Sequence, residues 1–400
     1  NSRKKRFDRW PSGIAGSAMG AATGNAVMVL YSIGSKFAGG GIGTTAYYAV
    51  RGLHRHGMLR RLLCGSFRPT EIPREKIRAI GLPDRALRKL ASLDSSGWLW
   101  HLQAVLYDFW ASRHLEPADV FHVWGNYGLR SIQRARGMGM VTVVERANTH
   151  PIYQARLLKE EYARWGLTFR VPRATLKRTL DEMALADYVV IPSEFVRQSF
   201  LEQEFPEDRL VCIPFGVDIE RFRPPEGNNP HPFRVLFTGQ VGIRKGVPYL
   251  LEAWRRLGWR DAELWLVGRV LPESQPILKH YRDLPGLNVV GHMEDPVRAY
   301  QQADIFVFPT VEEGSALVTY EALACGLPVV TTPNAGSVVQ EGVEGFIVPI
   351  RDVEALAERM ERLRADERLR REMGKAARAR AKEFTWERYG NSLSSTYKRR

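Results

Sequence analysis

The chain has 400 residues, of which 44% are hydrophobic, 10% aromatic and 26% charged. This composition is typical of a globular protein with two or three domains, and no run of 18 apolar residues indicates a membrane-spanning helix. The three cysteines, Cys64, Cys212 and Cys325, have neither metal-binding nor redox spacing, which fits a protein of the reducing cytoplasm.

The positive charge is concentrated near the N-terminus. The formal net charge is +14, and the first hundred residues hold 17 Lys or Arg against 5 Asp or Glu. Such asymmetry favours an anionic partner, either a membrane surface or an anionic acceptor, although a basic surface that serves only solubility remains the alternative. We expect no nucleic-acid partner. A signal peptide is also not expected, because no apolar core directly follows the basic residues 1–10.

Taken in chain order, the first half alternates between strands and helices. Residues 1–24 are predicted to be a loose tail that is rich first in Arg and Lys and then in Gly and Ala. A first core strand follows at residues 26–31, and a helix at residues 44–54 in which Thr44 or Thr45 is a candidate cap. Continued alternation up to residue 217 predicts an α/β domain over residues 25–217 with a parallel sheet.

A second alternation begins after a segment rich in Pro, Gly and Asn at residues 223–232. We expect a second domain over residues 218–383 and a terminal helix over residues 384–400. The two halves are similar in pattern, and no shorter repeat occurs.

Two glutamates in the second half have an informative spacing. A buried strand is expected at residues 305–308, followed by the loop EEGSAL and by a helix at residues 318–325 that is stopped by Gly326 and Pro328. Glu313 lies in the loop and Glu321 lies eight residues later, which rotates its side chain by only about 80° around the helix. Both carboxylates can therefore border one cleft at the carboxyl edge of a parallel sheet.

A pair of cations precedes another helix of the second half. A strand runs into Gly239, and Arg244 and Lys245 stand just before the helix that opens at Gly246. Unpaired N–H groups and the helix dipole favour anions at such a position, and two adjacent cations strengthen the preference. The pattern predicts a diphosphate-binding loop.

Together these runs resemble the retaining glycosyltransferases of family 4, which have the GT-B fold. The resemblance implies two Rossmann-like domains whose parallel sheets face each other across a cleft. It implies that Glu321 binds the ribose of a nucleotide sugar and that Lys245, with Arg244, neutralises the leaving diphosphate. The sequence departs from many relatives at Gln240, where they have Arg, and at Ala316, where they have a second Gly. The donor contacts that the resemblance implies are Gly239, Arg244, Lys245, Glu313, Gly314, Ser315, Ala316, Leu317 and Glu321.

The resemblance also implies roles for residues of the first half. Gly41 and Gly43, in a Gly-rich loop, are expected under the donor phosphates. His150 stands where relatives place a His near the anomeric centre, so the implied catalytic set is His150, Lys245 and Glu313. Weaker candidates for the wall of the acceptor pocket are His122, Trp124 and Asn126.

Some members of this family use a basic amphipathic helix to reach a membrane surface. Here the helix after the Gly-rich loop, with the residues that follow it, is a candidate, although a solvated basic face is the alternative. Its cationic or titratable residues are Arg51, His54, Arg55, His56, Arg60 and Arg61.

We therefore expect a retaining glycosyltransferase that moves a hexose-type sugar from a nucleotide sugar to a hydroxyl of a glycan, lipid or small molecule. The resemblance implies a cytoplasmic enzyme, peripheral on the inner membrane face if the basic region docks there. It implies no metal and no cofactor beyond the nucleotide sugar as co-substrate. The alternative is an inactive nucleotide-sugar-binding or membrane-docking scaffold. A dinucleotide oxidoreductase is disfavoured because residues 39–43 do not fit G-x-G-x-x-G.

Overall fold

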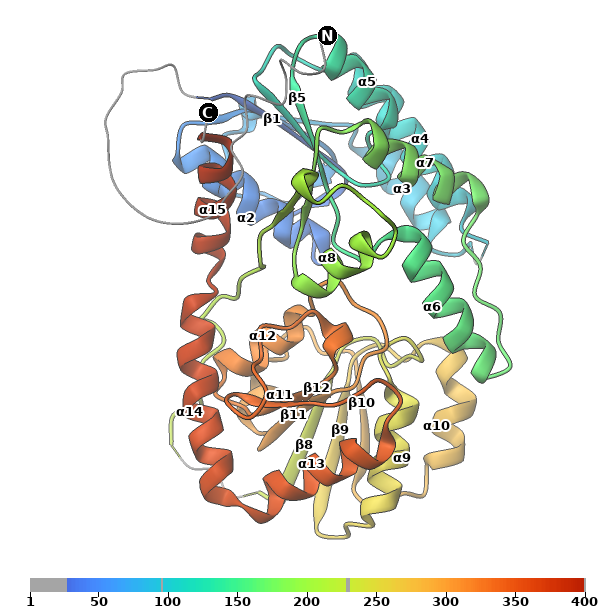
Figure 1. The fold of residues 1–400 in the computed structure, drawn as a ribbon, viewed down its shortest axis with the longest axis vertical. Coiled ribbons are helices and arrows are strands. Elements are labelled where there is room, and N and C mark those ends of the chain that lie inside the picture. The colour runs from blue at the N-terminus through green and yellow to red at the C-terminus, as the bar shows by residue number, and fades with distance from the viewer. Residues whose placement is uncertain (1–26, 95, 228–230, 399–400) are drawn as a thin grey trace.

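The computed structural model describes residues 27–94, 96–227 and 231–398. The expected tail at residues 1–24 and part of the 223–232 segment lie outside the described residues. Two α/β halves are stacked along the long axis of the molecule, each built around one parallel sheet (Figure 1). The strand expected at residues 26–31 is found at Val29–Phe37, so it runs further than predicted, and its later residues Ile33 and Phe37 are fully buried.

The N-terminal sheet has seven parallel strands in the order β3-β2-β1-β4-β5-β6-β7. Its central strands are apolar and buried, as strands covered on both faces must be. The strands are β1 (Val29–Phe37), β2 (Leu59–Phe67), β3 (Ile77–Ala79), β4 (Val120–Trp124), β5 (Val141–Glu145), β6 (Tyr188–Ile191) and β7 (Leu210–Cys212).

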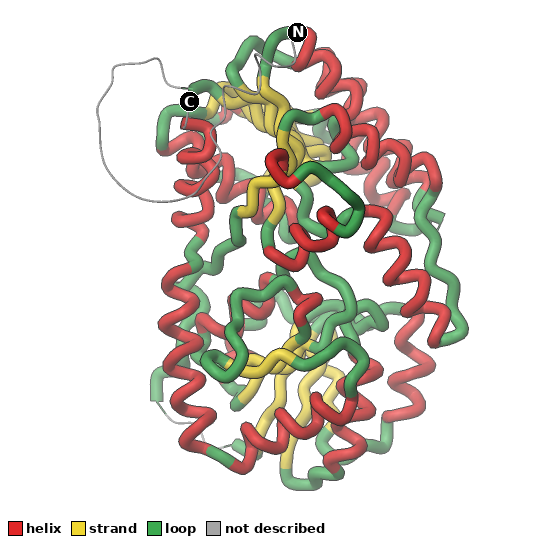
Figure 2. Tube along the Cα trace, in the orientation of Figure 1, coloured by secondary structure: helices red, strands yellow, loops and turns green. Residues whose placement is uncertain are grey.

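Helices cover both faces of this sheet, and side chains alternate between two cores along its strands. Leu30 of β1 belongs to the core that includes Tyr107 of α4, whereas Tyr31 belongs to the core on the side of α2. The helices are α2 (Ile42–Arg55), α3 (Leu82–Ala91), α4 (Trp98–Arg113), α5 (Leu129–Gly137), α6 (Pro151–Arg164), α7 (Arg173–Leu185) and α8 (Glu194–Leu201), with 3₁₀ turns η1 (Arg74–Lys76) and η2 (Glu207–Arg209). Figure 2 shows how these helices enclose the strands.

The C-terminal sheet has six parallel strands in the order β10-β9-β8-β11-β12-β13. The strands are β8 (Phe233–Thr238), β9 (Ala262–Val267), β10 (Leu287–Gly291), β11 (Ile305–Phe308), β12 (Val329–Thr331) and β13 (Gly345–Ile347). The remaining elements are α9 (Val247–Leu257), η3 (Pro272–Ser274), α10 (Gln275–Tyr281), α11 (Val297–Gln301), α12 (Leu317–Ala324), η4 (Pro333–Ala335), α13 (Val353–Ala365) and α14 (Glu367–Glu383).

Both sheets follow the Rossmann strand order, which reverses between the first and fourth strands. Ligands of such sheets bind at this reversal, outside the carboxyl ends of the strands. In this chain the reversals lie between β1 and β4 and between β8 and β11. The loops after these four strands are therefore where a site is to be sought.

The terminal helix α15 (Trp386–Lys398) returns to the N-terminal half and packs along α2 (Figure 1). Gly52 and Gly390 allow the two helices to approach, because a Cβ on Gly52 would lie 2.6 Å from the Cα of Gly390. Tyr389 and Tyr397 of α15 are buried in the N-terminal half. The C-terminal half is thus connected to the N-terminal half by two stretches of chain, which pair at the bridge between Val217 and Thr385.

The start of α2 differs from the prediction. The N-cap is Gly41, with a φ of 54° and no side-chain hydrogen bond, so neither Thr44 nor Thr45 caps the helix. A glycine suits this position because left-handed backbone carries no Cβ penalty there. Among the described residues, no helix combines the length and apolarity needed to cross a bilayer.

Candidate functional site

The loop between β8 and α9 brings two cations to the carboxyl edge of the C-terminal sheet. Gly239 ends β8 with a φ of 136°, and Gly246 opens α9 with a φ of 73°. A Cβ on Gly246 would lie 1.9 Å from the carbonyl oxygen of Pro309. Only glycine therefore lets α9 begin directly against the β11–α12 loop, which places Lys245 beside that loop.

Arg244 and Lys245 meet two consecutive glutamates. Lys245 forms an ion pair with Glu313, and Arg244 Nη2 lies 2.9 Å from Glu312 Oε2 and 3.9 Å from Glu313 Oε2. Burial, reinforced by the charge of Arg244, holds the pKa of Lys245 well below its usual value. An anion entering beside Lys245 would restore its preference for the charged form.

Glu312 connects the two halves of the molecule. It is fully buried and accepts hydrogen bonds from Thr149 Oγ1 at 2.7 Å and from Gln154 Nε2 at 3.0 Å. Burial alone would raise its pKa, but Arg244 and these hydrogen bonds outweigh it, so the pKa lies below the usual value. Sequence analysis missed this residue, because nothing in the Glu312-Glu313 dipeptide shows which carboxylate faces the opposite domain.

Gly314 is held against the N-terminal half. A Cβ on this residue would lie 1.4 Å from the carbonyl oxygen of Ala147, and its own carbonyl accepts a hydrogen bond from Ser193 Oγ. The structure therefore brings the loop that carries Glu313 against the segment that precedes His150. This contact unites predicted site residues from the two halves.

The first turn of α12 offers backbone donors to this loop. Ala316 is its N-cap and makes no side-chain capping bond. Within the described chain, no acceptor is found for the N–H groups of Leu317 and Val318, as is usual for an uncapped helix start. Ser315 is not available to cap them, because its hydroxyl pairs with Tyr320 at 2.9 Å. Unpaired N–H groups at a helix start suit an anionic ligand.

Glu321 lies one turn further along α12. Its Oε2 accepts a hydrogen bond from Tyr300 at 2.7 Å, and burial raises the pKa of this glutamate to about 7. The Tyr300 hydroxyl is in turn paired with Thr238 at the end of β8. A carboxylate can accept about four hydrogen bonds, so Glu321 retains capacity for a ligand that carries hydroxyl groups.

His150 is the N-cap of α6. Its Nδ1 accepts a hydrogen bond from the backbone N–H of Ile152 at 3.4 Å, and its ring meets Phe200 edge-on at 5.0 Å. Burial, followed by the charge of Arg146, lowers its pKa to about 4. The imidazole is therefore neutral near pH 7, and its proton is assigned to Nε2 because Nδ1 is an acceptor.

Gly41 and Gly43 lie after β1, at the edge of the N-terminal sheet where its reversal occurs. Gly43 has a packing role, because a Cβ there would lie 2.2 Å from the carbonyl oxygen of Lys36. Gly41 has open space in place of a Cβ. Among the described residues, neither contacts Lys245, Glu313 or Glu321 through a hydrogen bond or ion pair.

The three acceptor candidates of the sequence are engaged within the N-terminal half, and a part for them in the wall of an acceptor pocket stays a prediction. His122 is fully buried between Glu145 and Tyr397, and Trp124 Nε1 donates to Tyr31 at 2.7 Å. Asn126 has a φ of 78°, and its side chain accepts from Thr179. These residues hold α15 and the β4–α5 loop in place.

The basic face expected on α2 is partly neutralised. Arg51 pairs with Glu71 at 2.9 Å, Arg55 lies 3.9 Å from Glu387, and His56 hydrogen-bonds to Asn391. Arg60 and Arg61 share Glu116. These pairs offset part of the positive charge of α2 and β2, and docking of this helix on a membrane stays a prediction.

A second contact between the halves was not foreseen. Glu161 of α6 is fully buried, accepts from Tyr249 Oη at 2.6 Å, and pairs with Arg351 at 2.6 Å. Both partners belong to the C-terminal half. The halves are therefore held together on the α6 side as well as at Gly314.

Among the described residues, no three His, Cys, Asp or Glu side chains gather closely enough to hold a metal ion. The charged groups at the candidate site are instead the cations Arg244 and Lys245 with their glutamates.

Two family models match the chain, one for each half. The Glycosyltransferase Family 4 model matches residues 39–221, and the Glycosyl transferases group 1 model matches residues 232–366. The D-inositol 3-phosphate glycosyltransferase of Paenarthrobacter aurescens is 30% identical over 212 residues, which are 48% of this chain and 52% of that protein. The match thus spans about half the length of this curated relative.

Solved structures show the same fold. Sucrose-phosphate synthase from Thermosynechococcus elongatus superposes with a TM-score of 0.67 at 18% identity, over 93% of this chain and 98% of that chain. The Anabaena HepE complex with UDP and glucose gives a TM-score of 0.66 at 15% identity, over 92% and 99% of the two chains. The expected GT-B fold is confirmed by these neighbours and by the two parallel sheets.

Proposed function

The chain belongs to the family 4 glycosyltransferases of the GT-B fold, and from this premise we propose that it transfers a hexose-type sugar from a nucleoside diphosphate sugar to a hydroxyl group, with retention of anomeric configuration. The acceptor is a glycan, lipid or small molecule. One observation carries the proposal. The loop holding Glu313, beside Lys245, is pressed against the segment leading to His150 of the opposite domain.

Glu321 is proposed to bind the ribose of the donor. Its carboxylate is fixed by Tyr300 and has acceptor capacity to spare, so it can receive two hydroxyl donors from a diol. The nearby N–H groups of Leu317 and Val318 suit the diphosphate. This assignment is consistent with bound UDP in the Anabaena HepE structure, a protein of the same fold.

Lys245 is proposed to stabilise the diphosphate as it leaves. In the free protein its charge is compensated by Glu313, and the buried setting strengthens any interaction with developing negative charge. Arg244 is paired with Glu312, which is fully buried and held by Thr149 and Gln154, so we assign Arg244 as the secondary cation. Glu313 would be released by the incoming diphosphate and would then be free to accept hydrogen bonds from the transferred sugar.

For His150 we propose hydrogen-bond donation from Nε2 to the sugar near the anomeric centre. A neutral imidazole can do this without placing a second positive charge beside Lys245. Glu312 and Glu313 are both paired with cations, and neither is assigned as a nucleophile. We therefore propose that the acceptor attacks the face from which the diphosphate departs, with a phosphate oxygen taking its proton.

A nucleotide screen followed by a turnover assay tests this function. Thermal denaturation is measured with UDP, GDP, ADP and their common sugar conjugates, without added metal. We expect one nucleotide series to raise the melting temperature, and the matching sugar conjugate to be consumed with an acceptor panel. Stabilisation without turnover on any acceptor would favour the inactive binding scaffold, and no stabilisation by any nucleotide would contradict the donor site itself.

A further inference from the structure

Helix α4 has a buried face that is partly polar and an outer face that is largely apolar; Tyr107 and Ala111 join the core on the buried face. Its face toward the sheet carries Gln103, Asp108 and Ser112, each no more than 4% exposed. Its opposite face carries large apolar side chains that are open to solvent. An ordinary surface helix has the reverse arrangement, because burying apolar area stabilises the fold and burying polar groups costs free energy.

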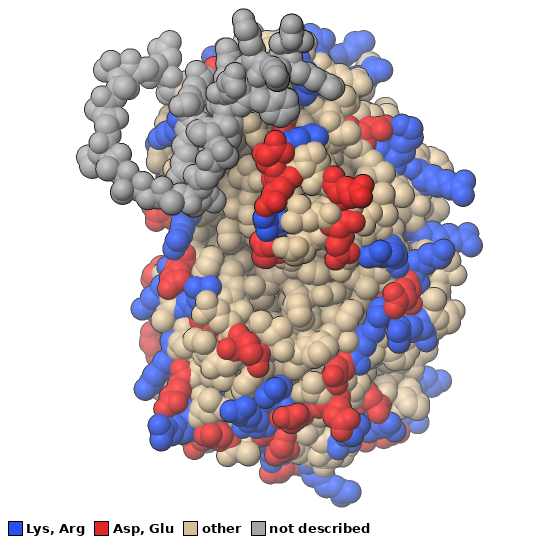
Figure 3. All heavy atoms as spheres, in the orientation of Figure 1, with Lys and Arg blue, Asp and Glu red and all other residues tan. Residues whose placement is uncertain are grey.

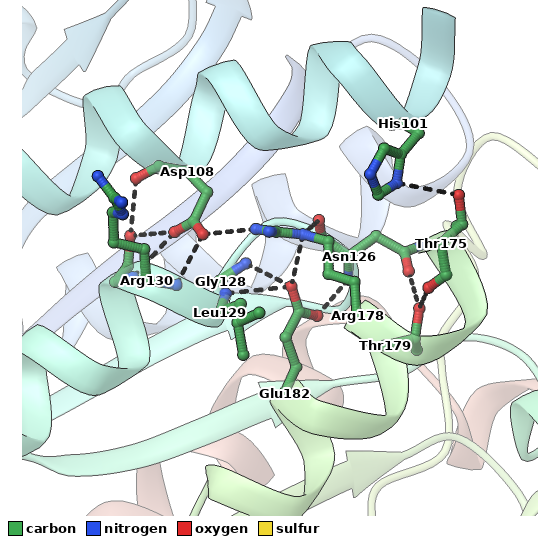
Figure 4. Close-up of polar contacts among 11 residues, drawn as sticks. His101, Asp108, Asn126, Gly128, Leu129, Arg130, Thr175, Arg178, Thr179 and Glu182 are labelled. Carbon is green, nitrogen blue, oxygen red and sulfur yellow. Dashed lines mark hydrogen bonds and ion pairs between the residues drawn. The ribbon is translucent and has the colours of Figure 1, made fainter. Parts of the chain in front are cut away.

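The inward polar side chains of α4 hydrogen-bond to neighbouring elements, although Oε1 of Gln103 has no partner among the described residues. Asp108 accepts from the backbone N–H groups of Arg130 and Ser131 at 2.7 and 2.9 Å, and it also pairs with Arg178. Gln103 donates to the carbonyl oxygen of Gly34 at 2.8 Å. Figure 4 shows Asp108 and Arg178 in one network between α4, α5 and α7. These bonds fix which face of α4 points outward.

The outward face forms one apolar stripe. The spacings of three, four and seven residues put its members on one side of the helix. We call this surface the α4 stripe. It consists of Trp98, Leu102, Val105, Leu106 and Phe109, which are 54%, 44%, 36%, 49% and 40% exposed. Leu90 of α3, which packs on α4, and Leu93 after that helix are also exposed.

Arginine side chains lie against the α4 stripe and beside it. Arg113 and Arg130 lie over the ring of Phe109 at 4.5 and 5.3 Å, and Arg88 lies over Trp100 at 5.5 Å. In the described chain, no ion pair is made by these three or by Arg85, Lys89 and Arg134 of the neighbouring helices α3 and α5. Lys and Arg side chains project along the edge of the molecule where α4, α5 and α7 lie (Figure 3).

We propose that the α4 stripe docks on the surface of an anionic phospholipid bilayer. Aliphatic and aromatic side chains would enter the interface, and the surrounding cations would meet lipid headgroups, as in interfacial helices. A tryptophan at the end of the stripe suits the headgroup level. A second copy of this chain fits less well, because two such faces would bring unpaired arginines against one another.

Docking here would place the cleft near the bilayer. Gln103 reaches Gly34 in the later part of β1, and the residues after α4 reach Met28 before β1 through the N–H of Asp119. Helix α4 therefore starts at the carboxyl edge of the sheet, which faces the cleft, and runs away from it. If the proposed glycosyl transfer is correct, an acceptor held in the bilayer is then within reach.

Vesicle flotation of the full chain tests the docking. We use vesicles of phosphatidylcholine alone and vesicles with an equal part of phosphatidylglycerol. The chain is expected to float with the anionic vesicles only, and less so as salt rises. Leu102→Gln with Leu106→Gln should lower binding by about tenfold, and Arg113→Glu with Arg130→Glu by at least about tenfold.

Matched variants on the C-terminal half control for general changes in polarity and charge. Val289→Gln with Val343→Gln replaces side chains that are 44% and 45% exposed, and Arg260→Glu with Lys279→Glu reverses two exposed charges. Both should bind vesicles like the wild type. Equal binding by all variants, or no binding to anionic vesicles, overturns the proposal.

Self-association of the chain through the α4 stripe would contradict docking on a bilayer. A dimer of the wild type in lipid-free sedimentation, abolished by Leu102→Gln with Leu106→Gln, would assign the α4 stripe to a second copy and overturn docking. Nucleotide stabilisation is measured on every variant as well. Since the α4 stripe shares no residue with the proposed donor site, failure of docking and failure of nucleotide binding are seen separately.

Discussion

Two glutamates, one in each half, have a pKa that burial raises to about 7, although Glu182 is fully buried and Glu321 is only partly buried. Glu182 in α7 accepts from three backbone N–H groups of the β4–α5 loop at 2.6, 2.9 and 3.1 Å and lies 3.4 Å from Arg178. Glu321 in α12 accepts only from Tyr300 among the described residues. The carboxylate of Glu182 therefore has its hydrogen bonds supplied by the fold, whereas the carboxylate of Glu321 keeps acceptor capacity that a ligand can use.

This difference extends to the edges that face the cleft. In the N-terminal half, the polar residues after β4 are engaged in fixing a loop and the terminal helix. In the C-terminal half, the N–H groups that open α12 and the carboxylate of Glu321 keep unused capacity. A polar residue at a sheet edge is therefore a candidate for ligand binding when its hydrogen bonds are incomplete, and a structural element when they are complete.

The largest effect is expected for Lys245→Ala, in the C-terminal half, where the candidate site keeps unused hydrogen-bonding capacity. If Lys245 meets charge that develops on the leaving diphosphate, turnover should fall by roughly 10²- to 10³-fold, the usual cost of losing one such group. Nucleotide Kd should change far less, because the interaction grows in the transition state. The comparison is steady-state turnover against Kd by calorimetry, with exposed Lys279→Ala as the control. Equal losses in Kd and turnover would make Lys245 a binding residue only.

In the N-terminal half, where the hydrogen bonds of Glu182 are supplied by the fold, Glu182→Ala should lower stability and leave nucleotide binding intact. The change leaves three backbone N–H groups without an acceptor and removes one of the two carboxylates that pair with Arg178. Together these losses should lower the free energy of unfolding by about 2–4 kcal/mol. Urea denaturation measures the loss, and calorimetry measures the Kd. A weaker nucleotide Kd with unchanged stability would reverse the comparison.

The smaller loss expected for Glu321→Ala concerns binding. Two ribose hydroxyls would lose their acceptor, which should weaken the nucleotide Kd by about 1–3 kcal/mol. Stability should not fall as it does for Glu182→Ala, because Glu321 has a single partner in the free protein. An unchanged Kd would remove the ribose assignment.

The pH dependence of nucleotide binding is the finest of these tests. The side chain of Glu321 acts purely as a hydrogen-bond acceptor only when it is ionised. Nucleotide affinity should therefore rise as the pH passes through about 7 and level off above it. The hydrogen bond from Tyr300 favours the ionised form, so Tyr300→Phe should move the midpoint to higher pH. Titrations across this range measure it. A flat profile in both proteins would show that Glu321 does not contact the ligand.

Much of the fold followed from alternating apolar runs and breakers. The helix predicted at residues 318–325 was found at Leu317–Ala324, because Gly326 and Pro328 define its end. Capping at α2 was wrong, since a left-handed glycine took the place of the expected threonine. A glycine in such a loop does not reveal its φ from sequence alone.

The candidate site was predictable only in part. Local spacing placed Glu321 eight residues, or about two helix turns, after Glu313, and the family resemblance placed Lys245 in the same site. The role of Glu312 depends on Thr149 and Gln154, which are more than 150 residues away. The burial of His122 likewise depends on Tyr397 of the terminal helix. Contacts between distant segments leave no periodic mark in the sequence.

The most direct test of the account is a matched pair of isosteric variants, Glu182→Gln and Glu321→Gln, titrated by calorimetry with the nucleotide that stabilises the wild type. We expect Glu321→Gln to weaken the Kd while Glu182→Gln leaves it unchanged and lowers only the free energy of unfolding. A wild-type Kd for Glu321→Gln, or a loss of affinity confined to Glu182→Gln, would contradict the claim that the open carboxylate of the C-terminal half binds the donor.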